Sequence, residues 1–148
     1  MKGERMVNSD RLKVTEIFQG LTYEELDKIA VICTLEDFKK GDTVILSREP
    51  AERFYLLEKG SVSLTFPNGQ EIVMDKPGSL AGWSALVSPH RYLGSMKCLE
   101  DCRFLVVPSK EFLEIITAEA SIGFKVMQRI SSVISDRLRL VAKGEQGE

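Results

Sequence analysis

The spacing of hydrophobic and polar residues divides the chain into three parts. Near the N-terminus, apolar residues at helical spacing over 11–18 predict a short helix that ends at Gly20. Thr22, with Glu25 three residues later, is typical of a capping box and predicts a second helix. From residue 34 onward, short β-branched or aromatic runs between turn residues indicate antiparallel strands. We predict strands over 43–46, 54–57, 61–66, 71–74, 92–98 and 102–107.

The helical pattern returns after Pro108. Ser109 is predicted to cap a helix over 110–117, and a longer helix follows over about 119–142. The apolar face of the longer helix could pack on the strands or meet its own copy in a two-fold dimer. Residues 143–148 have nothing to bury and are expected to fray. The apolar residues of this face are Val126, Met127, Ile130, Val133, Ile134, Leu138 and Val141.

Size and composition indicate one compact domain over residues 1–148, with 43% hydrophobic and 28% charged residues. The 20 basic and 22 acidic residues leave a formal net charge of -2, which gives no strong attraction to nucleic acid or anionic lipid. No apolar run approaches the roughly 20 residues that span a bilayer, and the start lacks the apolar core of a secretion signal. We therefore expect a cytoplasmic protein that contacts neither membranes nor nucleic acid.

Residues able to carry out chemistry are few. Cys33, Cys98 and Cys102 are an odd number of cysteines without an export signal, so we expect free thiols, and a redox role for Cys98 and Cys102 stays open. His90 is the only histidine, which disfavours a four-ligand metal site, and we place it in an exposed loop. The sequence contains no phosphate-binding loop, nucleophile elbow or catalytic triad. We predict that the protein is not an enzyme and holds no metal or cofactor.

The segment over 77–95 is too long to be a hairpin turn. Gly82 lets the backbone approach a neighbour closely, and residues 83–87 can form one helical turn whose free N–H groups attract an anion. Arg91 could supply a bidentate guanidinium, and the hydroxyls of Ser84 and Ser95 could add donors. The sequence therefore predicts a ligand-binding site in this segment.

Several separated motifs resemble those of the cyclic-nucleotide-binding domain family. They are the turn FKKGD over 38–42, the strand pair FYLLEKGSV over 54–62, and Pro77-Gly78 before the phosphate-binding segment. Their order and spacing agree over about 15–142. The family provides the sensory module of catabolite-activator-type bacterial regulators and of cyclic-nucleotide-gated channels and kinases.

The resemblance implies a mainly β fold with flanking helices. It is an antiparallel β-roll of the double-stranded jelly-roll type, of eight strands, here over about 34–108, with helices before it. Two helices follow over about 109–142, and the second, long one often forms a dimer interface or relays ligand binding to an effector.

The chain departs from the family pattern in the phosphate-binding segment. Nucleotide-binding members carry Gly-Glu where this chain has Gly82-Trp83, and an indole can only donate a hydrogen bond, whereas the glutamate holds the ribose hydroxyl. Counting back from Ser95 puts Tyr92 at the usual place of the phosphate-binding arginine, although Arg91 is the chemically suitable residue. The predicted ligand-binding residues are Gly82, Trp83, Ser84, Ala85, Leu86, Arg91, Tyr92 and Ser95.

Two functions are consistent with these features. The first is a regulatory sensor that binds cyclic AMP, cyclic GMP or another small phosphate-bearing ligand and signals through its C-terminal helices to an unknown effector protein. The second is a degenerate scaffold, with the pocket closed by Trp83, that acts in protein–protein interaction or dimerisation. The chain ends six residues after the predicted long helix, so we expect no DNA-binding domain.

Overall fold

The N-terminal helices form largely as the sequence predicts. The computed structural model describes residues 6–146, with the side chains of Val141 and 143–146 outside the description. The helix predicted over 11–18 is split into α2 (Ser9–Lys13) and the 3-10 turn η1 (Glu16–Phe18). Thr15 separates them because its backbone is extended and its hydroxyl donates to the Leu12 carbonyl at 2.6 Å. The next helix, α3 (Tyr23–Ala30), has the predicted capping box.

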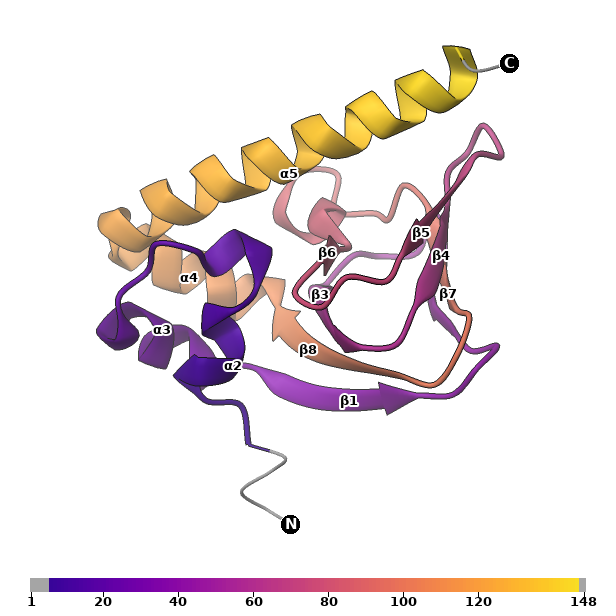
Figure 1. The fold of residues 1–148 in the computed structure, drawn as a ribbon. Helices are drawn as coiled ribbons and strands as arrows, with labels where there is room; N and C mark the ends of the chain where they lie inside the picture. The colour runs from indigo at the N-terminus through magenta and orange to yellow at the C-terminus, as the bar shows by residue number, and fades with distance from the viewer. Residues whose placement is uncertain (1–5, 147–148) are drawn as a thin grey trace.

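Eight strands within residues 6–146 form two four-stranded antiparallel sheets that wrap into a roll (Figure 1). The sheets have the orders β1-β8-β3-β6 and β2-β7-β4-β5. This confirms the mainly β fold with an antiparallel roll and flanking helices. The strands are β1 (Thr34–Phe38), β2 (Thr43–Ile45), β3 (Arg53–Lys59), β4 (Val62–Thr65), β5 (Glu71–Met74), β6 (Leu80–Ala81), β7 (Ser95–Cys98) and β8 (Cys102–Pro108).

All six predicted strands are present in the structure. The other two observed strands, β1 and β6, were not predicted. β1 carries Glu36 and Asp37, which are uncommon in strands; their carboxylates accept hydrogen bonds from Arg53 on β3 at 3.1 Å and Arg103 on β8 at 2.9 Å. Cross-strand ion pairs therefore accompany a segment with weak β propensity. β6 has only two residues, too few to produce an alternating pattern.

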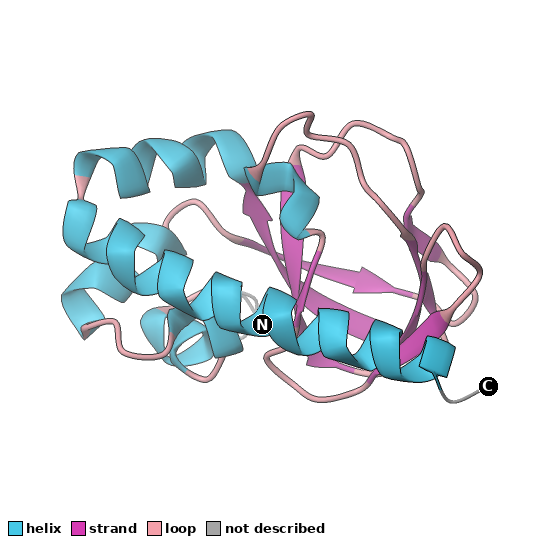
Figure 2. Ribbon diagram, turned by 90° about the horizontal axis from the view of Figure 1, so that it is seen from above, coloured by secondary structure: helices cyan, strands magenta, loops and turns pink. Residues whose placement is uncertain are grey.

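Two helices follow the roll, α4 (Ser109–Ala118) and α5 (Ala120–Gln146). The prediction that Ser109 caps α4 is wrong, because Ser109 is already helical and its hydroxyl donates to the Glu52 carbonyl at 2.9 Å. α5 continues beyond the predicted end near residue 142 to Gln146, and 147–148 lie outside the described residues. Figures 1 and 2 show α5 passing from the other helices across one side of the roll.

The core has two parts. One lies between the two sheets, where Tyr55 and Phe104 make an edge-on ring contact at 5.6 Å. The other lies between the β1-β8-β3-β6 sheet and the helices, where Phe112 contacts Phe18 and Phe54 at ring-centroid distances of 6.0 and 5.1 Å. The predicted apolar face of α5 divides: Val126, Ile130 and Val133 are buried in this second part, whereas Met127 and Leu138 are exposed.

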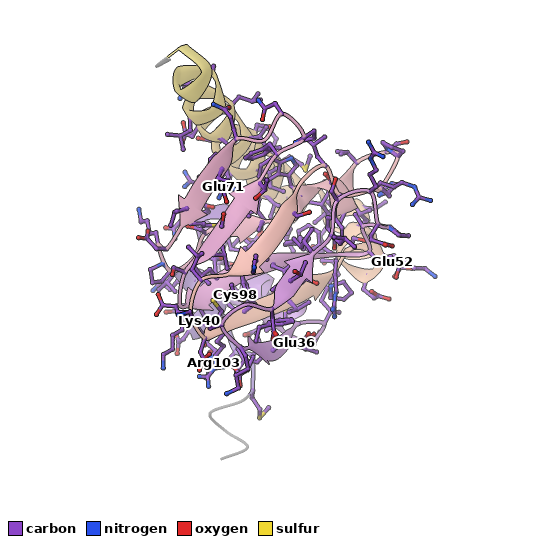
Figure 3. All side chains as sticks on the ribbon, turned by 90° about the vertical axis from the view of Figure 1, so that its right-hand side faces the viewer. Glu36, Lys40, Glu52, Glu71, Cys98 and Arg103 are labelled. Atoms are coloured by element: carbon purple, nitrogen blue, oxygen red, sulfur yellow. The ribbon has the colours of Figure 1, made fainter. Side chains whose placement is uncertain are left out.

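The outside of the roll carries the charged side chains, including Lys40, Glu71 and Arg103 (Figure 3). No helix among the described residues is long and apolar enough to cross a membrane. Within the same residues, no three His, Cys, Asp or Glu side chains come together as metal ligands would. His90 is exposed, as predicted.

Candidate pocket between the roll and the last helix

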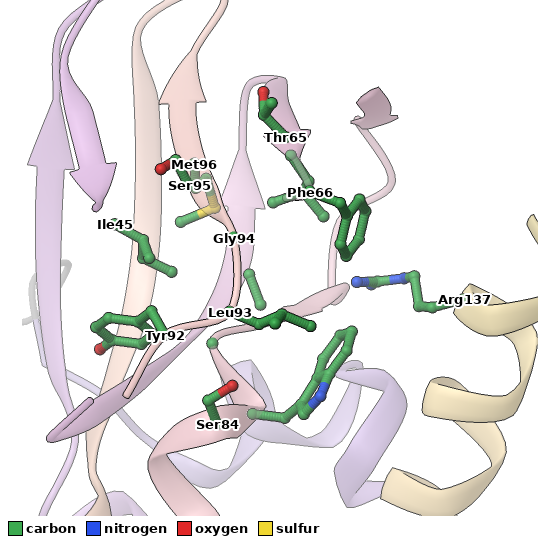
Figure 4. A pocket seen from close by; sticks show the side chains of 14 residues that line it. Ile45, Thr65, Phe66, Ser84, Tyr92, Leu93, Gly94, Ser95, Met96 and Arg137 are labelled. Carbon is green, nitrogen blue, oxygen red and sulfur yellow. The ribbon is translucent and has the colours of Figure 1, made fainter. Parts of the chain in front are cut away.

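A pocket lies where the 3-10 turn η2 (Trp83–Leu86) meets β4, β7, the segment 92–94 and α5. It encloses about 430 Å³, counting the space open to solvent. The roll supplies a mainly apolar wall that includes Ile45, Leu64 and Met96, and α5 supplies Arg137 (Figure 4). A ligand in this pocket would therefore contact the roll and α5 together.

Five of the eight predicted site residues line this pocket: Gly82, Trp83, Ser84, Tyr92 and Ser95. The other three do not. The side chain of Ala85 is buried between the two sheets, and Leu86 packs toward the helices. Arg91 is exposed, and its guanidinium donates to the Arg48 carbonyl at 3.0 Å. The structure thus brings the predicted set together only in part, and the predicted cation lies outside the pocket lining.

Gly82 has the close backbone approach that its sequence position predicts. Its φ is +84°, and a Cβ atom there would lie 3.3 Å from both Ile45 Cδ1 and Tyr92 Cε1. The residues after it form the expected single turn, which is a 3-10 turn and ends at Leu86. A side chain at position 82 would therefore strain the backbone and press on two walls of the pocket.

Tyr92 and Ser95 are already engaged with the roll. The Tyr92 hydroxyl donates to the Arg53 carbonyl at 2.5 Å, and burial raises the pKa of Tyr92 to about 12, so the ring is neutral near pH 7. Figure 4 shows this hydroxyl turned away from Arg137. Ser95 Oγ accepts the Ser47 N–H at 2.9 Å. Both residues therefore brace the pocket wall through hydrogen bonds to backbone.

Arg137 is the charged residue of the pocket lining, and sequence reasoning missed it. Only 9% of the residue is exposed. Its Nη2 donates to the Leu80 carbonyl at 2.8 Å and lies 3.5 Å from Glu16 Oε2, and its guanidinium lies over the Trp83 ring at 5.5 Å. Burial lowers the pKa of Arg137, and the charge of Glu16 opposes that shift. The guanidinium stays protonated, since arginine does not lose its proton in proteins.

The sequence does contain a signal for Arg137. The buried residues Val126, Ile130 and Val133 are spaced by four and three, and one more step of four reaches position 137. A charge that continues a buried apolar stripe indicates either an internal ion pair or a ligand contact. The broader apolar stripe predicted from the sequence continues through Leu138 instead, which is exposed.

Comparison with known families identifies the domain. The family model of the cyclic nucleotide-binding domain matches residues 35–119, more than half of the chain. This chain belongs to the cyclic nucleotide-binding domain family. A Geobacter metallireducens structure described as a cyclic nucleotide-binding protein is 26% identical, with a TM-score of 0.81 over 90% of this chain and 99% of that one. The regulatory domain of Toxoplasma gondii PKA, solved with cAMP, shares the fold at 21% identity and a TM-score of 0.71, over 88% of this chain and 51% of that one.

Cyclic nucleotide-binding domains also occur as parts of larger proteins among the relatives. Glutaminase 1 of Bradyrhizobium diazoefficiens is 24% identical over 82% of this chain, but only 20% of the glutaminase is matched. The chain spans between 8% and 24% of the length of the curated relatives that it matches. What the comparisons establish is a regulatory domain family with relatives that are named for cAMP or cGMP.

In this cyclic nucleotide-binding domain, Glu16 joins three segments around the pocket. Its carboxylate accepts the Leu80 N–H of β6 at 2.6 Å, and its carbonyl accepts a hydrogen bond from Arg129 of α5 at 2.9 Å. Its own N–H donates to the Gly78 carbonyl at 3.0 Å. The N-terminal segment, the roll and α5 therefore meet at one residue, whose Oε2 is 3.5 Å from Arg137 Nη2.

The cysteines of the domain are poorly suited to thiolate chemistry. Burial raises the pKa of Cys33 and of Cys98 to about 12. Cys102 is also buried, and its sulfur lies within hydrogen-bond distance of the Ser61 carbonyl at 3.3 Å. A thiol with a raised pKa is a weak nucleophile near neutral pH, which disfavours thiolate chemistry at Cys33 and Cys98.

Proposed function

We propose that this domain is a regulatory sensor that reversibly binds a small phosphate-bearing ligand in the pocket between η2 and α5. Cyclic AMP and cyclic GMP are the first candidates, because the family match is to a cyclic nucleotide-binding domain. One observation carries the proposal: the pocket has a wall from the roll and a wall from α5, the latter made by Arg137. The domain then acts as a binding module, not as an enzyme, and works in the cytoplasm on an effector protein.

The position of the pocket provides a route for signalling. A ligand shifts a conformational equilibrium only by the difference between its affinities for the two states. A ligand that contacts both walls binds more tightly when α5 lies against the roll than when it does not. Its binding would therefore favour the docked position of α5, and an effector attached to or touching α5 would respond.

Thermal unfolding and calorimetry with cyclic AMP and cyclic GMP test this function. Ligand at about 100 times its dissociation constant should stabilise the domain by about 2.7 kcal/mol. Ser84→Phe, which places a ring in the pocket lining, should remove the effect, whereas Ser88→Phe, on an exposed residue of the same loop outside the lining, should keep it. The function is wrong for these nucleotides if millimolar concentrations leave both the melting temperature and the heat of mixing unchanged.

A second candidate function is self-association through α5. Phe124 and Leu138 are 67% and 65% exposed and are separated by two heptads, and Met127 lies on the same face. Such a face is typical of a helix that pairs with another helix. Light scattering should report a dimer that Phe124→Lys disrupts and Ser132→Lys, on an exposed residue of the same helix outside this face, does not. A monomer at high concentration would rule out this candidate.

A further inference from the structure

Within the proposed ligand-binding function, we propose that Arg137 of α5 is the residue that binds the ligand's anionic group. The matching ligand is a small organic anion with one negative group and a compact, largely apolar or flat body. A cyclic phosphodiester satisfies this description. The charge that selects the ligand would then lie on the same helix whose position the ligand controls.

The hydrogen bonds of Arg137 leave one end of the guanidinium unused. Nη2 is bonded to the Leu80 carbonyl, but Nη1 is buried and has no hydrogen-bond partner among the described residues. A buried N–H group without an acceptor is costly, and it is costlier on a charged group. Figure 4 shows the guanidinium pointing from α5 toward Phe66, at the pocket. An anionic oxygen that enters the pocket would supply the missing acceptor.

Glu16 does not supply the acceptor that Nη1 of Arg137 lacks. Its Oε2 lies 3.5 Å from Nη2 of Arg137, while the same oxygen accepts the Leu80 N–H at 2.6 Å. The carboxylate is thus held mainly by the β6 backbone, and it faces Nη2, not the unpaired Nη1. Glu16 keeps the guanidinium in place and leaves Nη1 available for a second anion.

The rest of the lining argues for a single negative group. Of the described residues that line the pocket, only Arg137 carries a charge. Trp83 and Phe66 provide aromatic surface, and Leu93 and Met96 provide aliphatic surface. Glu16 lies at Nη2, so the guanidinium can bond one further anionic group through Nη1, whereas a polyphosphate would bury charge without partners. We therefore expect nucleoside triphosphates to bind much more weakly than cyclic monophosphates.

Trp83 makes the assignment directly measurable. It is the only tryptophan of the chain, and its ring lies 5.5 Å from the Arg137 guanidinium. Its fluorescence therefore reports on this pocket alone. We would titrate the full chain with cyclic AMP, cyclic GMP, diphenyl phosphate as a monoanion without a nucleoside, and adenosine as a neutral nucleoside.

Two matched variants separate the arginines. For each anion that binds, Arg137→Gln should raise the dissociation constant about 10–100-fold, which corresponds to the loss of a charge-assisted hydrogen bond. If adenosine binds, its dissociation constant should not change, because adenosine carries no charge. Arg91→Gln should change anion affinity by less than about 2-fold, because Arg91 lies outside the lining. If Arg137→Gln fails to fold, Arg137→Lys, which keeps the charge but not the planar fork, should still lose part of the affinity.

The outcomes distinguish this assignment from the proposed function. Anion binding that survives Arg137→Gln but is lost in Arg91→Gln overturns the assignment and leaves the sensor function standing. Binding of diphenyl phosphate that requires Arg137, without binding of either nucleotide, supports the assignment and contradicts the cyclic nucleotides as ligands. If none of the three anions changes Trp83 fluorescence or heat of mixing, both ideas fail, and Arg137 is a structural contact of α5.

Discussion

The first half of α5 and the part of α5 near Arg137 contact the rest of the domain in different ways. Ile122, Val126 and Ile130 are buried against the apolar side chains between the sheet and the helices. Two turns beyond Ile130, Arg137 reaches a pocket and keeps one buried nitrogen without a partner among the described residues. The first contact gains stability by removing apolar surface from water. The second contact places a charge where apolar packing would be more stable.

This difference separates what anchors α5 from what could regulate it. The first half of α5 is also tied to α3 by an ion pair, with Lys125 Nζ 2.9 Å from Glu25 Oε1. Glu119, the residue just before α5, forms a second one, with its Oε1 2.6 Å from Lys28 Nζ of α3. Near the pocket, α5 contacts the roll through Arg137. Nη2 of its guanidinium is bonded to the Leu80 carbonyl, but Nη1 has no hydrogen-bond partner among the described residues. A helix that is fixed at one end and incompletely bonded at the other is suited to respond to a ligand at the second end.

The largest effect should come from the apolar cluster against which the first half of α5 packs, which includes Phe112 of α4. Phe112 is fully buried and touches the rings of Phe18 and Phe54, so Phe112→Ala should lower the free energy of unfolding by about 3–5 kcal/mol. Denaturant unfolding would measure the loss. Phe124→Ala removes the same ring from an exposed site of α5 and should cost less than about 0.5 kcal/mol. Equal losses of unfolding free energy in the two variants would contradict the distinction between this buried cluster and the exposed face of α5.

The polar ties of α5 to α3 should give a smaller, pH-dependent effect. Hydrogen bonds from Lys125, and then from the Thr22 N–H, lower the pKa of Glu25 from 4.5 to about 2. A lowered pKa in the folded state stabilises the fold above about pH 4.5, and this stabilisation is lost as the pH falls toward 2.

Glu25→Gln should therefore cost about 1 kcal/mol at pH 7 and flatten the decline in stability between pH 5 and 2. Urea unfolding across this pH range would measure it. Glu24→Gln, on the exposed neighbour, should keep the wild-type decline. A wild-type slope in Glu25→Gln would show that the contact with Lys125 adds nothing to stability.

The apolar contact could be predicted from sequence far better than the pocket. The capping box located α3, and β-branched or aromatic runs between turn residues located six strands. Apolar periodicity located α5, because the helical period follows directly from burial on one face. Gly82 and the turn after it were found because glycine lets the backbone approach a neighbour closely, and the structure shows this approach at Ile45 and Tyr92. Arg91 was predicted as the cation because it is close to Gly82 along the chain, but it lies outside the pocket lining. Arg137 is 55 residues after Gly82 and reaches the pocket only through the packing of α5. The spacing of the buried residues of α5 indicates that position 137 is buried, but a local pattern does not show which distant segment the side chain contacts.

Replacing the buried charge tests the second contact without a ligand. Arg137→Met loses the bond to the Leu80 carbonyl but also removes an unpaired buried donor, so the free energy of unfolding should change by less than about 1 kcal/mol. Val133→Ala, one turn earlier on the buried apolar stripe, should cost about 2 kcal/mol. If Arg137→Met costs more than Val133→Ala in thermal or denaturant unfolding, the guanidinium anchors α5, and its unpaired nitrogen is of little consequence.

The smallest effect should come from Arg91. Its side chain is exposed and bonded to one carbonyl, that of Arg48, so Arg91→Ala should change stability by less than about 0.5 kcal/mol. Arg91 and Arg137 share no bonding partner, since Arg137 uses the Leu80 carbonyl and Glu16. The two substitutions in one chain should therefore add within about 0.5 kcal/mol, measured as unfolding free energies with and without cyclic AMP. A larger coupling that appears only with the nucleotide would mean that Arg91 turns into the pocket when the ligand binds, and the anion would then be shared between the loop and α5.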